Sequence, residues 1–283
     1  MASLIVFNPI SGKGQGKKQA LILATMLRAQ GEESQSVGTE QLESIDWGVV
    51  TKIIVVGGDG TLLKVLPYAL NQQKPVCMYP AGYQCLFARE FNYPKDHAKF
   101  LARILRGQVE KFQVGLANDH PFCSMTSVGV DSAVIKYLDQ TRKGPITSLT
   151  YPWATFKTLF SYRASVLTVH ANGELIIDAR RGYLIVGNNP QYALGLKMIP
   201  EAQMKSEVFA IRFVPCKHGL DFLLKTIFAL LTGRWNKYPL HFAGDITVSA
   251  DSKSQIAAQS DGDFIGDLPL HIVKSKQKLL VII

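Results

Sequence analysis

Gly57-Gly58-Asp59-Gly60-Thr61 is the stretch of this sequence that decides its fold. It directly follows the apolar run Ile53-Ile54-Val55-Val56 and directly precedes a helical pattern that begins at Leu62. Glycine-rich turns between a strand and a helix N-terminus bind phosphate, because backbone N–H groups approach the anion and the helix end is partly positive. In this turn Thr61 supplies a hydroxyl, and Asp59 can face a metal ion or an attacking hydroxyl. The alternative is a tight turn with a helix cap, which the same residue types favour.

A second glycine-rich turn lies between an apolar strand at 4–7 and a helix expected at 17–28. Its sequence is Asn8-Pro9-Ile10-Ser11-Gly12-Lys13-Gly14-Gln15-Gly16, and its spacing fits neither the P-loop nor the dinucleotide-binding fingerprint. Further strand–turn–helix units follow at 52–71 and 75–91. Three such units in succession predict a parallel sheet, with all three turns at the carboxyl ends of the strands, where open α/β sheets bind their ligands.

The sequence pattern changes near residue 112. Short alternating runs typical of an antiparallel sandwich follow, at 123–130, 165–171, 175–179, 182–186, 207–214, 245–249, 255–258, 270–273 and 278–283. Helices are expected at about 131–140 and 220–231. We therefore predict an N-terminal Rossmann-like α/β domain at 1–111 and a C-terminal antiparallel β-sandwich domain at 112–283, with the option that the last strand returns to the first domain. A cleft between the two domains is the expected active site.

The composition is that of a folded protein with an anionic partner. The chain has 283 residues, of which 47% are hydrophobic and 19% charged, and this balance excludes an intrinsically disordered chain. Its formal net charge of +9 suits a nucleotide, a nucleic acid or an acidic membrane surface. No segment reaches the roughly 18 uninterrupted apolar residues of a membrane span. Cysteines without paired spacing favour reduced buried thiols and a cytoplasmic location, so any membrane contact is expected to be peripheral, at the inner face.

Two segments, 144–163 and 220–235, combine aromatic or aliphatic residues with basic ones. This character suits a membrane interface. The plainer interpretation, which we favour from sequence, is a core helix with a solvated basic edge. Interleaved aromatic and basic residues also occur in nucleic-acid-binding proteins, but no recognition motif accompanies them here, so no nucleic-acid partner is expected.

Five motifs along the chain resemble those of the diacylglycerol kinase catalytic family, which includes bacterial lipid kinases and sphingosine kinases. They are Asn8-Pro9-x-Ser11-Gly12, the Gly57-Gly58-Asp59-Gly60-Thr61 turn, Pro80-Ala81-Gly82 followed by Phe87-Ala88-Arg89, Asn188 with Gly195 and Ile199-Pro200-x-Ala202, and Asp261-Gly262-Asp263. The resemblance covers nearly the whole chain. It implies transfer of the ATP γ-phosphoryl group to a hydroxyl of diacylglycerol, a sphingoid base or a related lipid alcohol. ATP and Mg²⁺ are the implied cofactors, a lipid at the membrane surface is the implied partner, and a homodimer is left open.

The resemblance also assigns roles to residues. In family members the residues that match the first two motifs contact ATP, so nucleotide binding is carried over to Asn8, Pro9, Ile10, Ser11, Gly12, Gly57, Gly58, Asp59, Gly60, Thr61, Leu62 and Leu63. The Asp261-Gly262-Asp263 turn resembles the family's Asp-Gly-Glu, whose last acid is taken as the general base. Asp263 is therefore the first candidate for this base, Asp261 the second, and Asp59 a further catalytic candidate.

Two departures from the family pattern bear on activity. The family's Pro-Ala-Gly-Thr-x-Asn-Asp reads Pro-Ala-Gly-Tyr-Gln-Cys-Leu here, so Tyr83 stands where a threonine would touch phosphate, and Cys85-Leu86 replaces a polar pair. Ser206 stands where family members use a carboxylate for a structural magnesium, and serine does not replace an anionic ligand of Mg²⁺. Glu207 could do so only by a register shift. The metal ligands are therefore unknown from sequence.

Two alternatives remain beside a lipid kinase. NAD kinases share the Gly-Gly-Asp-Gly-Thr turn, although the Asn8-Pro9 motif and the terminal Asp-Gly-acid turn favour the lipid branch. A catalytically degenerate relative that binds nucleotide or lipid would also fit, given the replacements at Tyr83, Cys85, Leu86 and Ser206.

Overall fold

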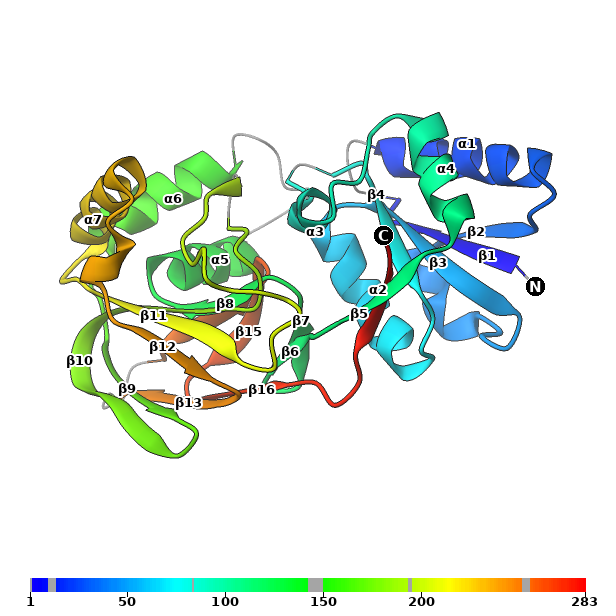
Figure 1. The fold of residues 1–283 in the computed structure, drawn as a ribbon. Helices are drawn as coiled ribbons and strands as arrows, with labels where there is room; N and C mark the ends of the chain where they lie inside the picture. The colour runs from blue at the N-terminus through cyan, green and yellow to red at the C-terminus, as the bar shows by residue number, and fades with distance from the viewer. Residues whose placement is uncertain (1, 10–13, 83, 142–149, 193–194, 251–254) are drawn as a thin grey trace. The chain divides into compact units, whose positions relative to one another are not determined.

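The computed structural model describes residues 2–9, 14–82, 84–141, 150–192, 195–250 and 255–283. The chain divides into two units, which are described separately (Figure 1). Unit 1 contains the chain up to Gln113, together with Gly195 and Lys276–Ile283. Unit 2 contains Val114–Tyr192 and Leu196–Ser275.

Unit 1 is built on one six-stranded sheet with helices packed on it. Its elements are β1 (Ala2–Phe7), α1 (Gln15–Ala29), β2 (Ser34–Gly38), η2 (Thr39–Ser44), β3 (Val50–Gly57), α2 (Asp59–Asn71), β4 (Val76–Pro80), α3 (Leu86–Glu90), α4 (His97–Arg106), β5 (Val109–Phe112) and β17 (Leu279–Ile282). The strands stand in the order β2-β1-β3-β4-β17-β5. The first four are parallel, β17 is parallel to β4, and β5 is antiparallel to β17. The predicted N-terminal parallel α/β sheet is therefore confirmed.

The inner strands of this sheet are apolar on both faces. Residues 4–6 of β1 and 53–56 of β3 are completely buried. Parallel strands covered on both faces appear in sequence as continuous apolar runs, which is why these strands could be predicted from the sequence. On α1, the apolar side chains Ala20, Leu23 and Leu27 are buried. The opposite side of α1 carries lysines and glutamines.

The order of the strands indicates at which edge of the sheet a ligand would be expected. The chain passes from β1 to β2 on one side of β1, and β3 then pairs with the other side of β1. The direction of winding therefore reverses between β1 and β3. In open α/β sheets, ligands bind outside the carboxyl ends of the strands at such a reversal. The two glycine-rich turns follow β1 and β3 directly, so the fold brings them to this edge.

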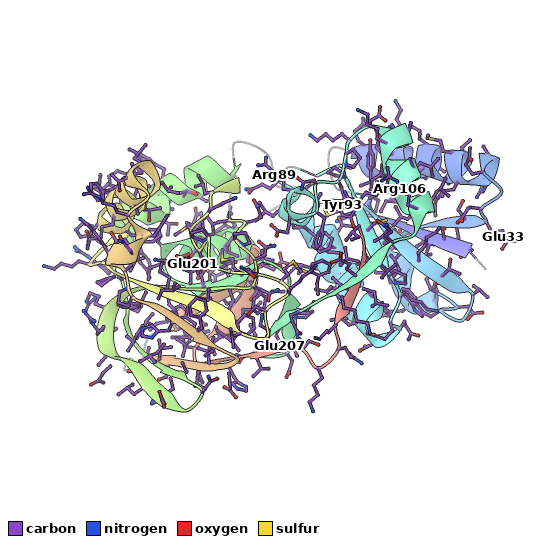
Figure 2. All side chains as sticks on the ribbon, viewed as in Figure 1. Glu33, Arg89, Tyr93, Arg106, Glu201 and Glu207 are labelled. Atoms are coloured by element: carbon purple, nitrogen blue, oxygen red, sulfur yellow. The ribbon has the colours of Figure 1, made fainter. Side chains whose placement is uncertain are left out.

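The last strand of the chain belongs to unit 1. β17 lies between β4 and β5 in the six-stranded sheet. Tyr93 fastens it there, since its hydroxyl donates to the backbone carbonyl of Ile282. The Tyr93 ring packs against Phe100 and lies under the Arg103 guanidinium, whose carbon is 4.5 Å from the ring centroid. Figure 2 shows Tyr93 among the side chains of unit 1.

Unit 2 is antiparallel throughout its described strands. Its elements are β6 (Gly115–Ala117), β7 (His120–Phe122), β8 (Met125–Val128), α5 (Val130–Thr141), α6 (Thr150–Ser161), β9 (Val166–Ala171), β10 (Glu174–Gly187), β11 (Phe209–Pro215), α7 (Gly219–Thr232), η4 (Trp235–Lys237), β12 (Leu240–Ala243), β13 (Asp245–Ala250), β14 (Ala257–Ser260), β15 (Asp263–Asp267) and β16 (Leu270–Lys274). The strand order is β15-β14-β8-β10-β9-β13-β16-β6-β7, with β11 beside β10 and β12 beside β11. Buried side chains such as Val186, Phe213 and Ile246 form one core inside these strands. The predicted C-terminal antiparallel sandwich is confirmed.

One expectation for unit 2 was wrong in detail. The runs at 175–179 and 182–186, expected as two strands, are a single strand, β10. Its register shifts twice, between Leu175 and Ile177 and between Ile177 and Arg180, and Ala179 has a φ of 42°. Such irregularities bend a strand, so the first part of β10 pairs with β9 and the second part with β8 and β11. The polar residues between the two runs mark a bend and not a turn.

Candidate active site

The Gly57-Gly58-Asp59-Gly60-Thr61 turn packs closely on the next loop of unit 1, which begins at Pro80. A Cβ atom added to Gly82 would lie 2.4 Å from the Gly58 Cα, so the two loops meet backbone against backbone. The Gly57 carbonyl accepts the N–H groups of Ala81 and Gly82, both at 3.0 Å. The Cys85 thiol donates to the same carbonyl oxygen at 3.3 Å. The third loop is therefore fixed to the glycine-rich turn by its main chain.

Asp59 faces the third loop. Its Oδ2 accepts the N–H of Leu86 at 2.9 Å and its Oδ1 accepts the N–H of Phe87 at 3.0 Å. Burial raises the pKa of Asp59, while these N–H donors act in the opposite direction. Both carboxylate oxygens thus hold the first turn of α3, which gives Asp59 a positioning role. Its catalytic and nucleotide-binding roles stay predictions.

The Thr61 hydroxyl is buried beneath the turn. The residue is only 1% exposed, and its Oγ1 has no hydrogen-bond partner within the described residues. A Cβ atom on Gly57 would lie 2.3 Å from this oxygen, so Gly57 is required where the Thr61 side chain packs. Leu62 is also buried, whereas Gly60 is exposed and has open space around its Cα. Phosphate contacts at this turn would therefore come from the main chain.

The first glycine-rich turn is described only at its two ends. Asn8 is half-buried and Pro9 is exposed, and at the other end Gly14, with φ of 80°, precedes α1. A Cβ atom on Gly16 would lie 3.2 Å from the Asn8 carbonyl oxygen, so the start of α1 packs on the turn. The predicted nucleotide contacts Ile10, Ser11 and Gly12 lie outside the described residues, as does Tyr83.

Two helix N-termini meet the sheet at this edge. α1 begins after Gly14 and α2 begins after Gly58, and no described side chain caps either of them. Uncapped N-terminal N–H groups carry partial positive charge and bind phosphate. Because β1 and β3 are neighbours at the reversal of the sheet, both helix ends serve the same edge. This placement is compatible with the phosphate binding predicted from the sequence, which stays a prediction.

The Asp261-Gly262-Asp263 turn joins β14 to β15 in unit 2. Asp261 has a φ of 47°, and its carboxylate accepts the N–H groups of Cys123 at 2.6 Å, Ser124 at 2.9 Å and Met125 at 2.8 Å. These contacts anchor the turn to the start of β8. Asp263 is exposed, at the first position of β15. Of the two predicted bases, Asp263 is the one whose side chain faces solvent.

A third carboxylate, Asp131, is connected to this turn through Gln259 and was missed by the sequence reasoning. Its Oδ2 accepts hydrogen bonds from the Ser127 hydroxyl at 2.7 Å, the Tyr183 hydroxyl at 3.0 Å and the Tyr192 hydroxyl at 3.1 Å. Burial raises its pKa. Gln259 extends the network, donating to Asp131 at 3.3 Å and accepting the Gly262 N–H at 2.9 Å. The signal was available, because Gly129-Val130-Asp131 also joins a strand to a helix.

The residues around Ser206 do not fit a magnesium ion. The Ser206 hydroxyl accepts the N–H of Val208 at 3.2 Å. The Lys274 Nζ donates to Asn188 Oδ1 at 2.6 Å and lies 4.0 Å from the ring centroid of Phe209, so a cation stands at the start of β11, three residues after Ser206. Burial lowers the pKa of Lys274 to about 8, and Glu207 opposes this shift. Across the described ranges, no three His, Cys, Asp or Glu side chains gather as a metal site would require.

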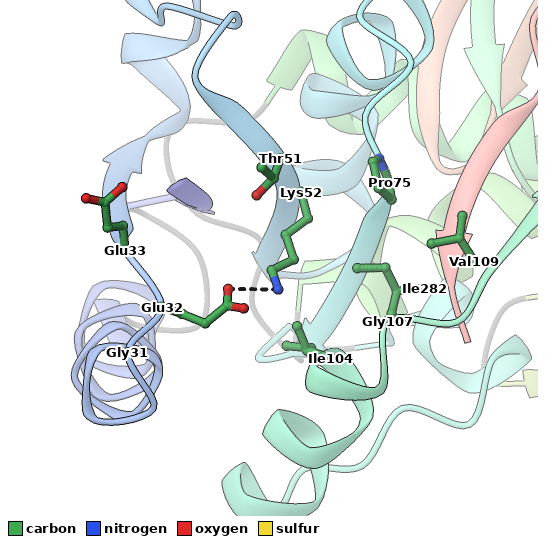
Figure 3. A pocket seen from close by; sticks show the side chains of 10 residues that line it. All are labelled: Gly31, Glu32, Glu33, Thr51, Lys52, Pro75, Ile104, Gly107, Val109 and Ile282. Carbon is green, nitrogen blue, oxygen red and sulfur yellow. Dashed lines mark ion pairs between the residues drawn. The ribbon is translucent and has the colours of Figure 1, made fainter. Parts of the chain in front are cut away.

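Two cavities, one in each unit, lie away from the glycine-rich turns and from the Asp261-Gly262-Asp263 turn. One of about 710 Å³ is in unit 1, and Figure 3 shows the Lys52–Glu32 ion pair, 2.9 Å long, inside it. Its lining residues Glu33 and Pro75 directly precede β2 and β4, so it opens at the amino ends of the parallel strands, opposite the glycine-rich turns. A cavity of about 530 Å³ in unit 2 is bordered by α5 and by the chain that follows α6. Neither contains a residue predicted for the site.

The helices in the described part of the chain are all too short or too polar to cross a bilayer.

Family models and curated relatives match most of the chain. Residues 2–117 match the family model of the diacylglycerol kinase catalytic domain, and residues 124–283 match that of the YegS C-terminal NAD kinase beta sandwich-like domain. A diacylglycerol kinase of Staphylococcus saprophyticus is 23% identical over 98% of this chain and 93% of its own length, and one of Staphylococcus aureus is 23% identical over 97% and 90%.

The fold is shared with a solved structure. The crystal structure of a diacylglycerol kinase from Bacillus anthracis superposes with a TM-score of 0.73 at 19% identity, covering 99% of this chain and 96% of that one. At this identity the likeness establishes the fold alone. The two family models together span almost the entire chain, the second of them more than half. The chain therefore belongs to the diacylglycerol kinase catalytic domain family of kinase-type phosphotransferases.

Proposed function

We propose that this protein transfers the γ-phosphoryl group of ATP to the hydroxyl of a lipid alcohol, with diacylglycerol as the first candidate acceptor. Membership of the family supports kinase chemistry, and the names of the relatives supply the acceptor class. The observation that carries the proposal is the edge of unit 1 where the turns after β1 and β3 meet two uncapped helix N-termini.

The proposed binding of ATP uses main-chain groups. Phosphoryl transfer depends mainly on positioning the donor and neutralising its charge. The N-termini of α1 and α2 supply partial positive charge for the phosphates. Gly58 and Gly82 keep the second and third loops in backbone contact, and a substituent at Gly82 would force these loops, with the N–H groups proposed to bind the anion, apart.

The proposed acceptor step uses an acid of unit 2. Asp263 takes the proton from the lipid hydroxyl while the hydroxyl oxygen forms a bond to the γ-phosphorus, and the bond between that phosphorus and the bridging oxygen of ADP breaks. Asp263 fits this role better than Asp261, because the Asp261 carboxylate is occupied by three backbone N–H groups. The resemblance to the family makes Mg²⁺ the expected companion of ATP. The region of Ser206 does not fit a second, structural ion, and no step is assigned to one.

The test is an assay with labelled ATP. Purified protein is incubated with ATP, Mg²⁺ and separate acceptors: diacylglycerol, ceramide and sphingosine in mixed micelles, and NAD in solution. Label in diacylglycerol, lost in Asp263→Asn but retained in the exposed control Asp119→Asn, supports the proposal. Label in NAD alone would favour the NAD kinase alternative. Mixed micelles present the lipid without requiring membrane docking.

The degenerate alternative has a structural observation in its favour. The Cys85 thiol and the Leu86 side chain stand where family members carry a polar pair, and Cys85 is buried, with φ of 50°. If this loop has lost its catalytic chemistry, ATP will raise the melting temperature but no acceptor will be labelled. Absence of any melting shift at millimolar ATP and Mg²⁺ would contradict both the kinase and the nucleotide-binding alternative.

A further inference from the structure

Helix α7 of unit 2 is apolar on two opposite sides. Phe222 and Ala229 lie on its buried side. The other side exposes an apolar stripe with helical spacing: Leu220, Leu224, Ile227, Phe228 and Leu231. Leu224 is 61% exposed and Leu231 is 83% exposed. A helix that is apolar all round is normally buried by protein or lipid on every side, so this stripe is an interaction surface.

Helix α6 continues this surface. Phe156 and Phe160, one helical turn apart, are each 61% exposed, with ring centroids 4.8 Å apart. The two helices touch closely at the start of α7, where a Cβ atom on Gly219 would lie 2.3 Å from the Leu159 carbonyl oxygen. Figure 1 shows α6 and α7 side by side in unit 2. We name the seven exposed apolar residues on these helices the α6–α7 face: Phe156, Phe160, Leu220, Leu224, Ile227, Phe228 and Leu231.

The exposed charges on α6 and at the ends of α7 are basic. Exposed basic residues stand on α6 and at both ends of α7: Lys157, Lys217, Arg234 and Lys237. The Lys237 ammonium lies 5.0 Å from the centroid of the Phe228 ring. Asp221 is the only acid within residues 154–163 and 214–244, and it is paired with Lys225 at 3.1 Å. An apolar stripe bordered by bases fits the interface of an anionic bilayer, where apolar side chains enter the acyl region and ammonium groups meet phosphate.

We propose that the α6–α7 face docks this protein onto the surface of an anionic membrane. The charge complementarity favours a bilayer over an apolar protein surface, which would gain nothing from the flanking lysines. The proposal rests on the proposed function only in that a diacylglycerol acceptor resides in a bilayer. Docking itself needs neither ATP nor catalysis, so it is measured without them.

Vesicle co-sedimentation without nucleotide tests the proposal. Vesicles contain either phosphatidylcholine alone or phosphatidylcholine with anionic phosphatidylglycerol. We expect binding to the anionic vesicles that falls about tenfold or more in Leu224→Gln/Leu231→Gln. The matched control is Leu175→Gln, an apolar residue of unit 2 that is 51% exposed outside the α6–α7 face, and it should bind as wild type. Arg234→Gln/Lys237→Gln should lose the preference for anionic vesicles.

Three results would overturn the proposal. The first is no binding of the wild type to anionic vesicles. The second is equal binding by the Leu224→Gln/Leu231→Gln variant with an unchanged melting temperature. The third is a lipid-free dimer, detected by light scattering, that becomes monomeric in this variant while vesicle binding stays unchanged, because the α6–α7 face would then join two copies of the chain. Loss of vesicle binding with normal labelling of micellar diacylglycerol would separate docking from the kinase reaction.

Discussion

The carboxylate of Asp59 accepts a hydrogen bond of 2.9 Å from the backbone N–H of Leu86, which joins the glycine-rich turn after β3 to a loop where this chain departs from the family pattern. Leu86 lies where relatives have a carboxylate of their own. In this chain its side chain contributes no polar atom, yet its N–H fixes the orientation of Asp59. The altered loop thus keeps the geometry of the turn while its own side-chain chemistry has changed.

Replacing Asp59 by alanine should destabilise unit 1. The change leaves the N–H groups of Leu86 and Phe87 without their acceptor, a loss similar to that of a helix cap, and we expect the free energy of unfolding to fall by about 1–2 kcal/mol. Part of the loss is offset, because a buried carboxylate is no longer desolvated. Urea unfolding measures the difference, with the exposed Glu43→Gln as control. An unchanged midpoint would contradict the positioning role.

Gly82→Ala and Gly60→Ala should have opposite effects on stability. The new Cβ at position 82 would lie 2.4 Å from the Gly58 Cα, so the loops must separate, and we expect a loss of about 1–3 kcal/mol. At position 60, in the first turn of α2, the new methyl group meets nothing within 4 Å. Alanine there should stabilise the protein by about 0.4–1 kcal/mol. Urea unfolding measures the free energy of unfolding of both variants. Equal changes of the same sign would contradict the close packing of Gly82 on Gly58.

Thr61→Val should leave stability and nucleotide affinity largely intact. Its hydroxyl is buried without a partner among the described residues, so removing it should keep the free energy of unfolding within about 1 kcal/mol of wild type or raise it. Thr61→Ser keeps the hydroxyl but loses a buried methyl group, and should be less stable by about 1 kcal/mol. The ATP-dependent melting shift is the second measurement. A shift lost in Thr61→Val but kept in Thr61→Ser would show that the hydroxyl reaches the phosphate after all.

Substitution of Asp261 should affect stability, whereas substitution of Asp263 should affect catalysis. Asp261→Ala removes the acceptor of three backbone N–H groups and should cost about 2–3 kcal/mol. Asp263→Asn changes an exposed side chain and should alter stability by no more than about 0.5 kcal/mol. As the proposed base, it should nevertheless lower phosphoryl transfer at least about 100-fold. Full activity in a folded Asp263→Asn protein would remove this residue from the mechanism.

Lys274 should make stability rise with pH in alkaline solution. Its pKa is lowered to about 8 in the folded protein, from 10.5, so between these values the unfolded chain binds more protons than the folded one. The contribution of Lys274 to the free energy of unfolding then increases with pH over this window, by at most about 3 kcal/mol. Below the window this contribution does not change with pH. Lys274→Met should abolish the increase, whereas Lys276→Met, at an exposed site, should not. Urea unfolding across pH 8 to 10.5 gives the difference between the curves, and parallel curves would refute the assignment.

Sequence reasoning succeeded where one local pattern fixed the structure. Residues 53–56 form a continuous apolar run because β3 is covered on both faces, and the following glycines mark the turn to α2. It failed at β10, whose two halves look like two strands because the polar residues between them mark a bend. Local periodicity reports which face of a strand is buried, but it does not report whether the chain turns back or only changes direction.

The site was predictable as a set of loops but not as a set of side-chain directions. Asp59 is bound by a residue 27 positions away, and Asp261 by one 138 positions away. Such partners are chosen by the folded chain, and the motif alone shows only that an acid is present. For Asp131 the strand-to-helix position was visible in the sequence, but its donors Tyr183 and Tyr192, which come from distant parts of unit 2, were not.

The position of β17 has a consequence for any attempt to study the nucleotide-binding half by itself. A fragment that stops at Gln113 would lack the strand that stands between β4 and β5. It would leave the edges of both strands unpaired and the Tyr93 hydroxyl without the Ile282 carbonyl. Open edges of this kind recruit other chains, so the fragment is expected to aggregate. During synthesis, most of unit 1 is made first, but its sheet can be completed only after all of unit 2 has been made, because β17 follows unit 2 in the sequence.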